Sequence, residues 1–225
     1  MSSPRTGQVV NVCFHGVGTP LRELDSGEEI YWVGTDPFLH LLDELTTWPA
    51  VRITFDDGNA SDLEIALPAL AERRLRADFF PLAGRLGEPG SLGEDGIREL
   101  RRHGMRVGTH GMWHRPWRRM DPDTRHEELV EARRRLAEVA QTSIDVAACP
   151  FGQYDRTALA ALRRLGYTRV FTSDRRGARA DAWLQPRYSV RRHDTRESLR
   201  TAALTRPPLL RRVRQNTAVV AKRWR

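Results

Sequence analysis

Short apolar segments alternate with longer amphipathic segments along most of this chain, and this alternation limits the possible folds more than any other feature. Strands are predicted at 8–16, 51–57, 77–83, 105–110, 144–152 and 167–173, with a further candidate at 182–190. Helices are predicted between them, at 36–45, 61–75, 93–104, 121–141 and 155–166. Asp36 with Pro37 is the expected start of the first helix, and Ser61 is the expected cap of the second. Repeated strand–helix units predict an α/β fold with a parallel sheet, either open or closed into a barrel.

The length and composition fit a globular protein with a substantial core. A chain of 225 residues with 40% hydrophobic and 29% charged residues is expected to form one large domain. It contains no apolar segment of about 18 residues, and its N-terminal segment lacks the apolar centre of a secretory signal, so we expect a cytoplasmic protein. Two cysteines, Cys13 and Cys149, are too few for a disulfide framework and lack the spacing of a zinc ribbon.

Positive charge is concentrated at the C-terminus. The formal net charge is +8, and residues 206–225 contain seven basic residues and no acidic one. We therefore predict a catalytic domain at 1–205 followed by a basic tail at 206–225. Such a tail can be solvated or docked as a helix, or it can contact anionic lipid, a lipid-linked saccharide or an acidic partner. The sequence contains no nucleic-acid-binding motif, so no nucleic acid is expected.

Side chains capable of catalysis follow several of the predicted strands. His15 follows the first strand, Asp56 and Asp57 end the strand at 51–57, and His110 and His114 come at and after the end of the strand at 105–110. In parallel α/β folds the active site lies at the carboxyl ends of the strands. We therefore expect these residues to lie at the same end of the fold.

The spacing of His110 and His114 suggests a metal site. On a helical turn, residues i and i+4 place both imidazoles on one face. Together with Asp57 they make a set of two histidines and one carboxylate, which suits a catalytic Zn²⁺ with one position open for water. Another divalent metal, such as Co²⁺, Ni²⁺ or Mn²⁺, could also bind. The alternative is that Asp57 belongs to an ordinary Asp-Gly turn and the histidines to an unrelated tryptophan-rich loop.

Three motifs in this order resemble those of a known family. "TFDDG" at 54–58 and "THGMWH" at 109–114 resemble the first two motifs of the polysaccharide deacetylases, the NodB-homology enzymes of carbohydrate esterase family 4. "ACPFGQYD" at 148–155 resembles their third motif, and the resemblance extends over residues 8 to 195. It implies a distorted (β/α) barrel and metal-dependent removal of N-acetyl or O-acetyl groups from sugars.

The resemblance also implies roles for individual residues. Asp57, His110 and His114 would be the metal ligands, with Zn²⁺ the first expectation. Asp56 would be the general base, which explains why two carboxylates stand side by side: the metal ion neutralises one and leaves the other free. The backbone N–H of Phe151 would stabilise the oxyanion.

The sequence departs from the family pattern at two positions. The third motif usually begins with an arginine that steadies the base, but Ala148 stands there, and Arg187 is a candidate replacement. The general acid usually comes from a C-terminal Leu-x-His motif, where this chain offers only His193 in a poorly matching segment. His15 after an apolar strand matches better. This arrangement resembles the circularly permuted poly-N-acetylglucosamine deacetylase-like subgroup.

The substrate is expected to be an acetylated amino sugar or glycan. Trp113 and Trp117 flank the metal motif and could stack on sugar rings, although core packing is the alternative. Tyr154 and Arg187 are further candidates for substrate binding. Two other functions remain open at this stage: hydrolysis of a non-sugar amide or imide C–N bond, and a non-catalytic barrel that binds a glycan.

Overall fold

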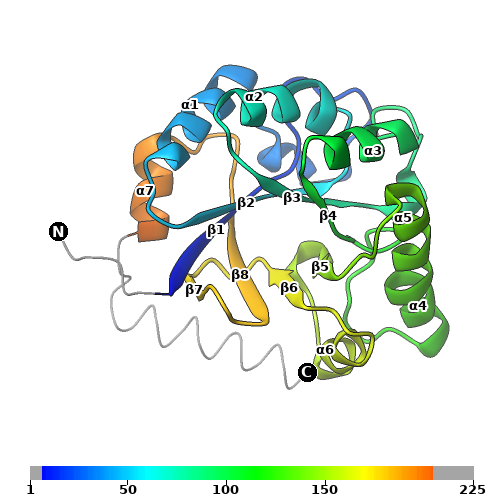
Figure 1. Ribbon diagram of the computed structural model, residues 1–225. Helices are drawn as coiled ribbons and strands as arrows, with labels where there is room; N and C mark the ends of the chain where they lie inside the picture. Colours follow the sequence, from blue (N-terminus) through cyan, green and yellow to red (C-terminus); the bar gives the residue numbers. More distant parts are fainter. Residues whose placement is uncertain (1–6, 205–225) are drawn as a thin grey trace.

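The computed structural model describes residues 7–204 and has a sheet of seven parallel strands at its centre (Figure 1). The strand order is β4-β3-β2-β1-β8-β6-β5. The bounds are β1 (Gln8–Phe14), β2 (Val51–Asp57), β3 (Ala77–Pro81), β4 (Arg106–Val107), β5 (Val146–Ala148), β6 (Arg169–Thr172) and β8 (Leu184–Ser189). A short strand, β7 (Ala178–Arg179), pairs with β1 in the antiparallel direction.

The sheet curves until its two edges nearly meet. Thr109, just after β4, makes a parallel bridge to Ala147 in β5. The Thr109 N–H donates to the Val146 carbonyl at 3.1 Å, and the Ala148 N–H donates to the Thr109 carbonyl at 2.9 Å. At the opposite side β1 pairs in parallel with both β2 and β8, so the N-terminal strand joins the two halves of the sheet. The predicted distorted (β/α) barrel is therefore confirmed.

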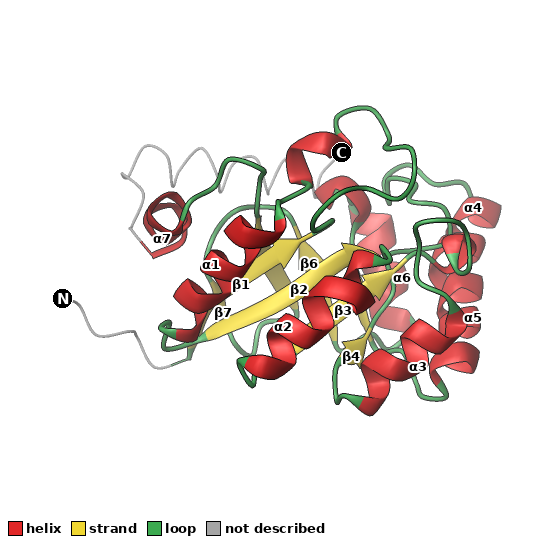
Figure 2. Ribbon diagram, turned by 90° about the horizontal axis from the view of Figure 1, so that it is seen from above, coloured by secondary structure: helices red, strands yellow, loops and turns green. Residues whose placement is uncertain are grey.

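Helices surround the barrel on the outside (Figure 2). They are α1 (Thr35–Thr46), α2 (Leu67–Glu72), α3 (Glu94–Arg102), α4 (Pro122–His126), α5 (Ala132–Ala140), α6 (Arg156–Arg164) and α7 (Arg196–Leu204). Short 3-10 turns lie at η1 (Glu28–Tyr31), η3 (Ala83–Arg85) and η5 (Pro150–Gly152). Two π-helical turns, η2 (Asp62–Ala66) and η4 (Glu127–Glu131), run directly into α2 and α5.

The alternation of side chains along β2 separates the core from the site. Ile53 and Phe55 belong to the large buried cluster that also contains the apolar residues of α1, α2 and α3. Thr54 and Asp56 face the other way, where both accept hydrogen bonds from the buried Arg187. The period of two in a strand thus places one face against the helices and the other inside the barrel.

Several local predictions need correction. The first helix begins at Thr35 after Gly34, and not at Asp36. Ser61 does not cap a helix with its side chain; its hydroxyl accepts a hydrogen bond from the Val17 N–H at 3.2 Å instead. The segment at 121–141 is divided by the π-helical turn into α4 and α5, although Asp121 does cap α4 through the Thr124 N–H. β7 and α7 were not predicted.

Within residues 7–204, no helix has both the length and the apolar character required to cross a membrane. The predicted basic tail at 206–225 lies outside the described residues. The division of the chain into a domain at 1–205 and a tail at 206–225 stays a prediction.

Candidate active site

The carboxyl ends of the strands surround a cavity of about 210 Å³. Nearly every strand end contributes to its lining: His15 after β1, Asp56 and Asp57 in β2, Arg85 after β3, His110 and His114 after β4, Phe151 after β5, Ser173 after β6 and Ser189 in β8. The remaining lining residues, between Asp25 and Tyr31, belong to the connection from β1 to α1. The expected convergence of reactive residues is therefore present.

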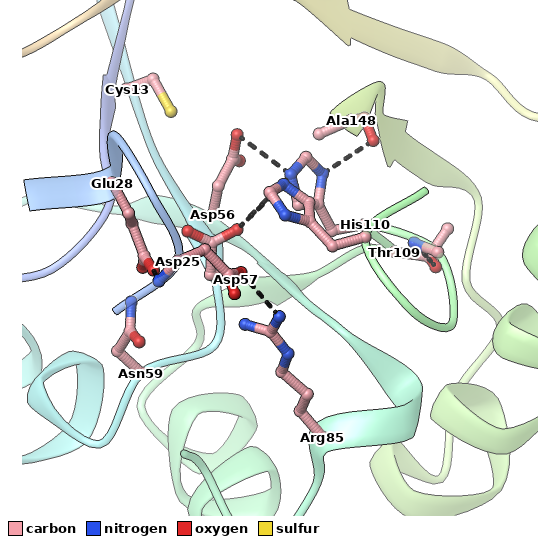
Figure 3. A network of polar contacts seen from close by, with 12 residues as sticks. Cys13, Asp25, Glu28, Asp56, Asp57, Asn59, Arg85, Thr109, His110 and Ala148 are labelled. Atoms are coloured by element: carbon pink, nitrogen blue, oxygen red, sulfur yellow. Dashed lines mark hydrogen bonds and ion pairs between the residues drawn. The ribbon is translucent and has the colours of Figure 1, made fainter. Parts of the chain in front are cut away.

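Asp57, His110 and His114 have the donor set of a divalent metal site. Asp57 Oδ1 lies 3.6 Å from Nε2 of His110 (Figure 3). It also lies 3.6 Å from Nε2 of His114. These donor atoms all lie within 4.8 Å of one another. Asp57 Oδ1 is buried and has no hydrogen-bond partner among the described residues. A buried carboxylate oxygen without a partner is costly, so these three residues fit a divalent ion bound between them.

Both imidazoles are in a form that can donate a lone pair to a metal ion. His110 Nδ1 donates to the Ala148 carbonyl at 2.9 Å, which directs the lone pair of Nε2 toward Asp57. Burial is the main influence on His114, and it lowers the pKa of this side chain to about 4. His114 is therefore neutral near pH 7, and a neutral imidazole is the form that binds a metal ion.

The segment from Gly108 to His114 is a loop, not the helical turn that the spacing of the histidines suggested. His114 has a left-handed backbone conformation, with φ of 59°. The two rings nevertheless approach each other, with centroids 5.0 Å apart. The two histidines therefore lie close together, as predicted. The predicted helical turn was wrong, because a loop brings the rings together.

Glu128 holds this loop in place. Its two carboxylate oxygens accept hydrogen bonds from the Met112 N–H and the Trp113 N–H, each at 3.0 Å. A Cβ on Gly111 would lie only 2.2 Å from a Glu128 oxygen, so only glycine allows the carboxylate to approach the loop this closely. Glu128 is fully buried and comes from η4, the π-helical turn. A π-helical turn shifts the direction of the following side chains and often occurs at functional sites.

Asp56 forms a buried ion pair with Arg187. The Arg187 guanidinium donates to both carboxylate oxygens, with both distances at 2.6 Å, and also to the Thr54 hydroxyl at 3.1 Å. Asp56 is 2% exposed and Arg187 is 0% exposed. Burial is the largest single influence and raises the pKa of Asp56, but the charge and hydrogen bonds of Arg187, together with the nearby His110 and His15, outweigh it and hold this pKa well below its usual range. Asp56 is therefore ionised although it is buried.

Three residues of the cavity wall have strained backbones. Among the described residues, seven non-glycine residues have positive φ, and three of these are Asp57 (74°), His114 (59°) and Phe151 (55°). A positive φ in a bulky residue is uncommon and costs free energy. The strain is therefore concentrated in two candidate ligands and the candidate oxyanion residue, which supports this cavity as the candidate functional site.

His15 lines the same cavity. Its ring stacks on Tyr31 with centroids 4.8 Å apart, and its Nδ1 is buried with no hydrogen-bond partner among the described residues. A ring nitrogen of His15, a carboxylate oxygen of Asp56 and Sγ of Cys13 lie within 4.8 Å of one another. His193, the competing candidate, is exposed and does not line the cavity.

The residues predicted to bind substrate are placed less favourably. Trp117 and Tyr154 are both fully buried in a cluster beneath α6, so neither presents a ring face to a sugar, and these two predictions need correction. Arg187 faces Asp56 inside the barrel and not the cavity, which corrects its assignment to substrate binding. Trp113 is 43% exposed, and its stacking on a sugar stays a prediction.

Other residues of the site were missed by sequence reasoning. They are Glu128, Arg85 and Tyr31. Arg85 and Tyr31 lie in connections, where nothing in the local sequence distinguishes them from surface residues. For Glu128, the only available signal was an acidic residue on the buried face of the 121–141 helix.

Comparison with known proteins gives a consistent result. A family model described as polysaccharide deacetylase matches residues 44–170. The chain is also similar to "Putative polysaccharide deacetylase YxkH" of Bacillus subtilis (strain 168), with 24% identity over 141 residues, which are 63% of this chain and 50% of that protein. This chain thus spans about half the length of that curated relative.

Solved structures share the fold. The Streptococcus pyogenes deacetylase PplD, in complex with acetate, superposes with a TM-score of 0.75 at 20% identity, covering 89% of this chain and 99% of that one. IcaB from Ammonifex degensii superposes with a TM-score of 0.69 at 22% identity, covering 87% and 96%. At this level of identity the likeness establishes the barrel fold.

Proposed function

This chain belongs to the polysaccharide deacetylase family, and on that basis we propose that it is a metal-dependent hydrolase that removes N-acetyl or O-acetyl groups from an amino sugar or glycan. The family resemblance inferred from the motifs is confirmed. The observation that carries the proposal is the meeting of Asp57, His110 and His114 in one cavity beside a separate, ionised Asp56.

Asp57, His110 and His114 would hold the metal ion, for which Zn²⁺ is the first candidate. When bound, such an ion supplies Lewis acidity and brings the pKa of a water molecule toward neutrality, so that a weak base is sufficient to take its proton. Asp56 suits that task because Arg187 keeps it ionised and fixes the direction of both its oxygens. In this arrangement Arg187 takes the role of the arginine that usually stands at the position of Ala148.

The other side chains of the cavity would complete the reaction. The backbone N–H of Phe151 would donate to the oxyanion that forms when the acetyl carbonyl is attacked. His15 would give a proton to the leaving amine, which otherwise departs poorly. Tyr31 supports this role by stacking on the His15 ring and limiting its orientations.

Release of acetate from a panel of substrates tests the proposal. The zinc-loaded protein should release acetate from N-acetylglucosamine glycosides or oligomers and leave cyclic amides and imides intact. Ring opening of an imide without acetate release would favour hydrolysis of a non-sugar C–N bond. Binding of the sugars without any turnover would favour a non-catalytic barrel.

Two expectations stay predictions. Residues 206–225, with their possible contact with anionic lipid or a lipid-linked saccharide, lie outside the described part of the chain. The cytoplasmic location rests on sequence composition alone.

A further inference from the structure

One side of the cavity is closed by a wall built from the connection between β1 and α1. Asp25, Ser26, Gly27, Glu28 and Tyr31 all line the cavity from this connection. The rest of the lining comes from the strand ends, where Phe151 is 57% exposed. The cavity is therefore bounded on one side by the 25–31 wall and is more open near Phe151.

The wall is fixed at both of its ends. The Gly18 N–H donates to the Val33 carbonyl at 2.8 Å, and the Val33 N–H donates to the Gly16 carbonyl at 3.0 Å. Trp32 packs so closely on Gly16 that a Cβ there would lie 2.1 Å from the indole ring. The chain between these points is a compact loop whose ends are held together.

A charged network inside the wall anchors it to the segment that follows β2. Arg22 pairs with Glu28 through both terminal nitrogens of its guanidinium, Nη1 and Nη2, and both side chains are 11% exposed. Arg22 also donates to Asn59 Oδ1 at 3.0 Å, and Asn59 comes two residues after Asp57. Because this ion pair is largely shielded from water, opening the wall would expose or unpair its charges.

Arg85 lines the cavity and connects the wall to the segment after β3. It projects from η3 and donates from Nη2 to Asp25 Oδ2 at 2.9 Å (Figure 3). Arg85 is 22% exposed in its side chain and Asp25 is 62% exposed, so this contact forms a partly exposed rim of the cavity lining. The two residues come from different strand–helix connections, and their ion pair joins those connections.

The volume of the cavity agrees with a small bound group. Its volume is about 210 Å³. Pockets that bind drug-sized ligands usually have volumes of about 300–1,000 Å³. A sugar within a long chain needs space for neighbours on both sides. A sugar at the end of a chain needs space on one side only.

We propose, on the basis of the deacetylase function proposed above, that the cavity takes an acetamido sugar at the end of a glycan chain or in a short glycoside, because the 25–31 wall and the Asp25–Arg85 ion pair exclude a second neighbour. The terminal sugar lies against the wall, and the rest of the glycan leaves past Phe151.

The position of deacetylation tests this directly. The zinc-loaded protein is incubated with a chitin hexamer and with an aryl glycoside of N-acetylglucosamine, and the products are sequenced by mass spectrometry. The wild type should remove acetate from one terminal sugar of the hexamer and from the aryl glycoside. Arg85→Ala and Asp25→Ala should open the rim, produce internal deacetylation, and raise the ratio of kcat/KM for hexamer over glycoside about tenfold.

Arg98→Ala is the matched control, because this α3 arginine pairs with Glu94 and Asp95 away from the cavity. It should leave the product pattern unchanged. Internal deacetylation by the wild type would overturn the proposal and leave the deacetylase function intact. An unchanged pattern in both rim variants would show that the wall does not set the position. No acetate from either substrate would remove the deacetylase function itself, and the chain-end proposal with it.

Discussion

Arg187 contacts both carboxylate oxygens of Asp56 at 2.6 Å, although 131 positions separate the two residues in the sequence. The pair is formed because β8 lies next to β1, and β1 lies next to β2. It brings a positive charge to the inside of the barrel, where the ring faces of Phe80 and Phe171 each lie 5.7 Å from the guanidinium carbon. Asp56 thereby stays ionised without exposure to water.

Replacing Arg187 by Met should destabilise the protein strongly. It leaves Asp56 buried without a partner, and breaking a buried ion pair in this way costs about 3–5 kcal/mol. Arg187→Lys keeps the charge but loses the forked geometry, so it should recover part of the stability and little of the turnover. The free energy of unfolding in urea and the rate of acetate release measure the two effects. Arg179→Ala breaks an exposed ion pair with Asp181 and, as the control, should leave the free energy of unfolding almost unchanged. Wild-type turnover in Arg187→Lys would contradict the role given to the paired hydrogen bonds from the Arg187 guanidinium to Asp56.

Asp56→Asn should separate catalysis from metal binding. Asn keeps the shape, and Asp56 is not a proposed ligand, so the metal content should stay the same. Loss of a general base lowers kcat by about 10²–10⁴-fold. Asp57→Asn should instead lower the metal content. Metal analysis beside kinetics distinguishes the two roles, and the opposite pattern would mean that they are exchanged.

His15→Ala and His193→Ala decide which histidine is the general acid. His15 lines the cavity and His193 is exposed outside it, so only His15→Ala should retain metal and lose most of its turnover. If His193→Ala shows these effects and His15→Ala does not, the assignment of the N-terminal strand is wrong.

Glu128 should influence metal affinity without touching the metal. Glu128→Gln keeps one acceptor for the loop that carries both histidines, and Glu128→Ala keeps none. Loss of a residue that orients metal ligands typically weakens metal affinity about 10–100-fold, so Ala should weaken Zn²⁺ binding more than Gln. Competition with a chelating dye measures this affinity. Glu131→Gln, at the partly exposed last residue of the same turn, is the control. A folded Glu128→Ala variant with wild-type zinc affinity would rule out this role.

The parts of the site that follow strands were predictable from the sequence. An apolar segment with period two fixes where a strand ends, and parallel strands place their ends together, so Asp57 and His110 could be expected to meet. The partner of Asp56 was harder, because it depends on which strands become neighbours. Arg187 was identified only as a candidate replacement for a missing arginine.

Burial and loop geometry were beyond what the sequence shows. Trp117 and Tyr154 are aromatic residues of the kind that could stack on sugars, yet tertiary packing buries both. His110 and His114 have helical spacing, but the hydrogen bonds from their loop to Glu128 hold a different backbone. These outcomes depend on contacts between distant segments, which local periodicity does not record.

The most direct test of the account is to measure bound zinc and acetate release on the same samples of wild type, His114→Ala and His103→Ala. His103 is an exposed histidine at the end of α3 and serves as the matched control. Wild type and His103→Ala should bind one zinc ion per chain, lose activity when a chelator removes it, and recover activity when zinc is restored. His114→Ala should bind little zinc and release no acetate. Full zinc occupancy in His114→Ala, or undiminished acetate release by metal-free wild type, would contradict the proposed metal site.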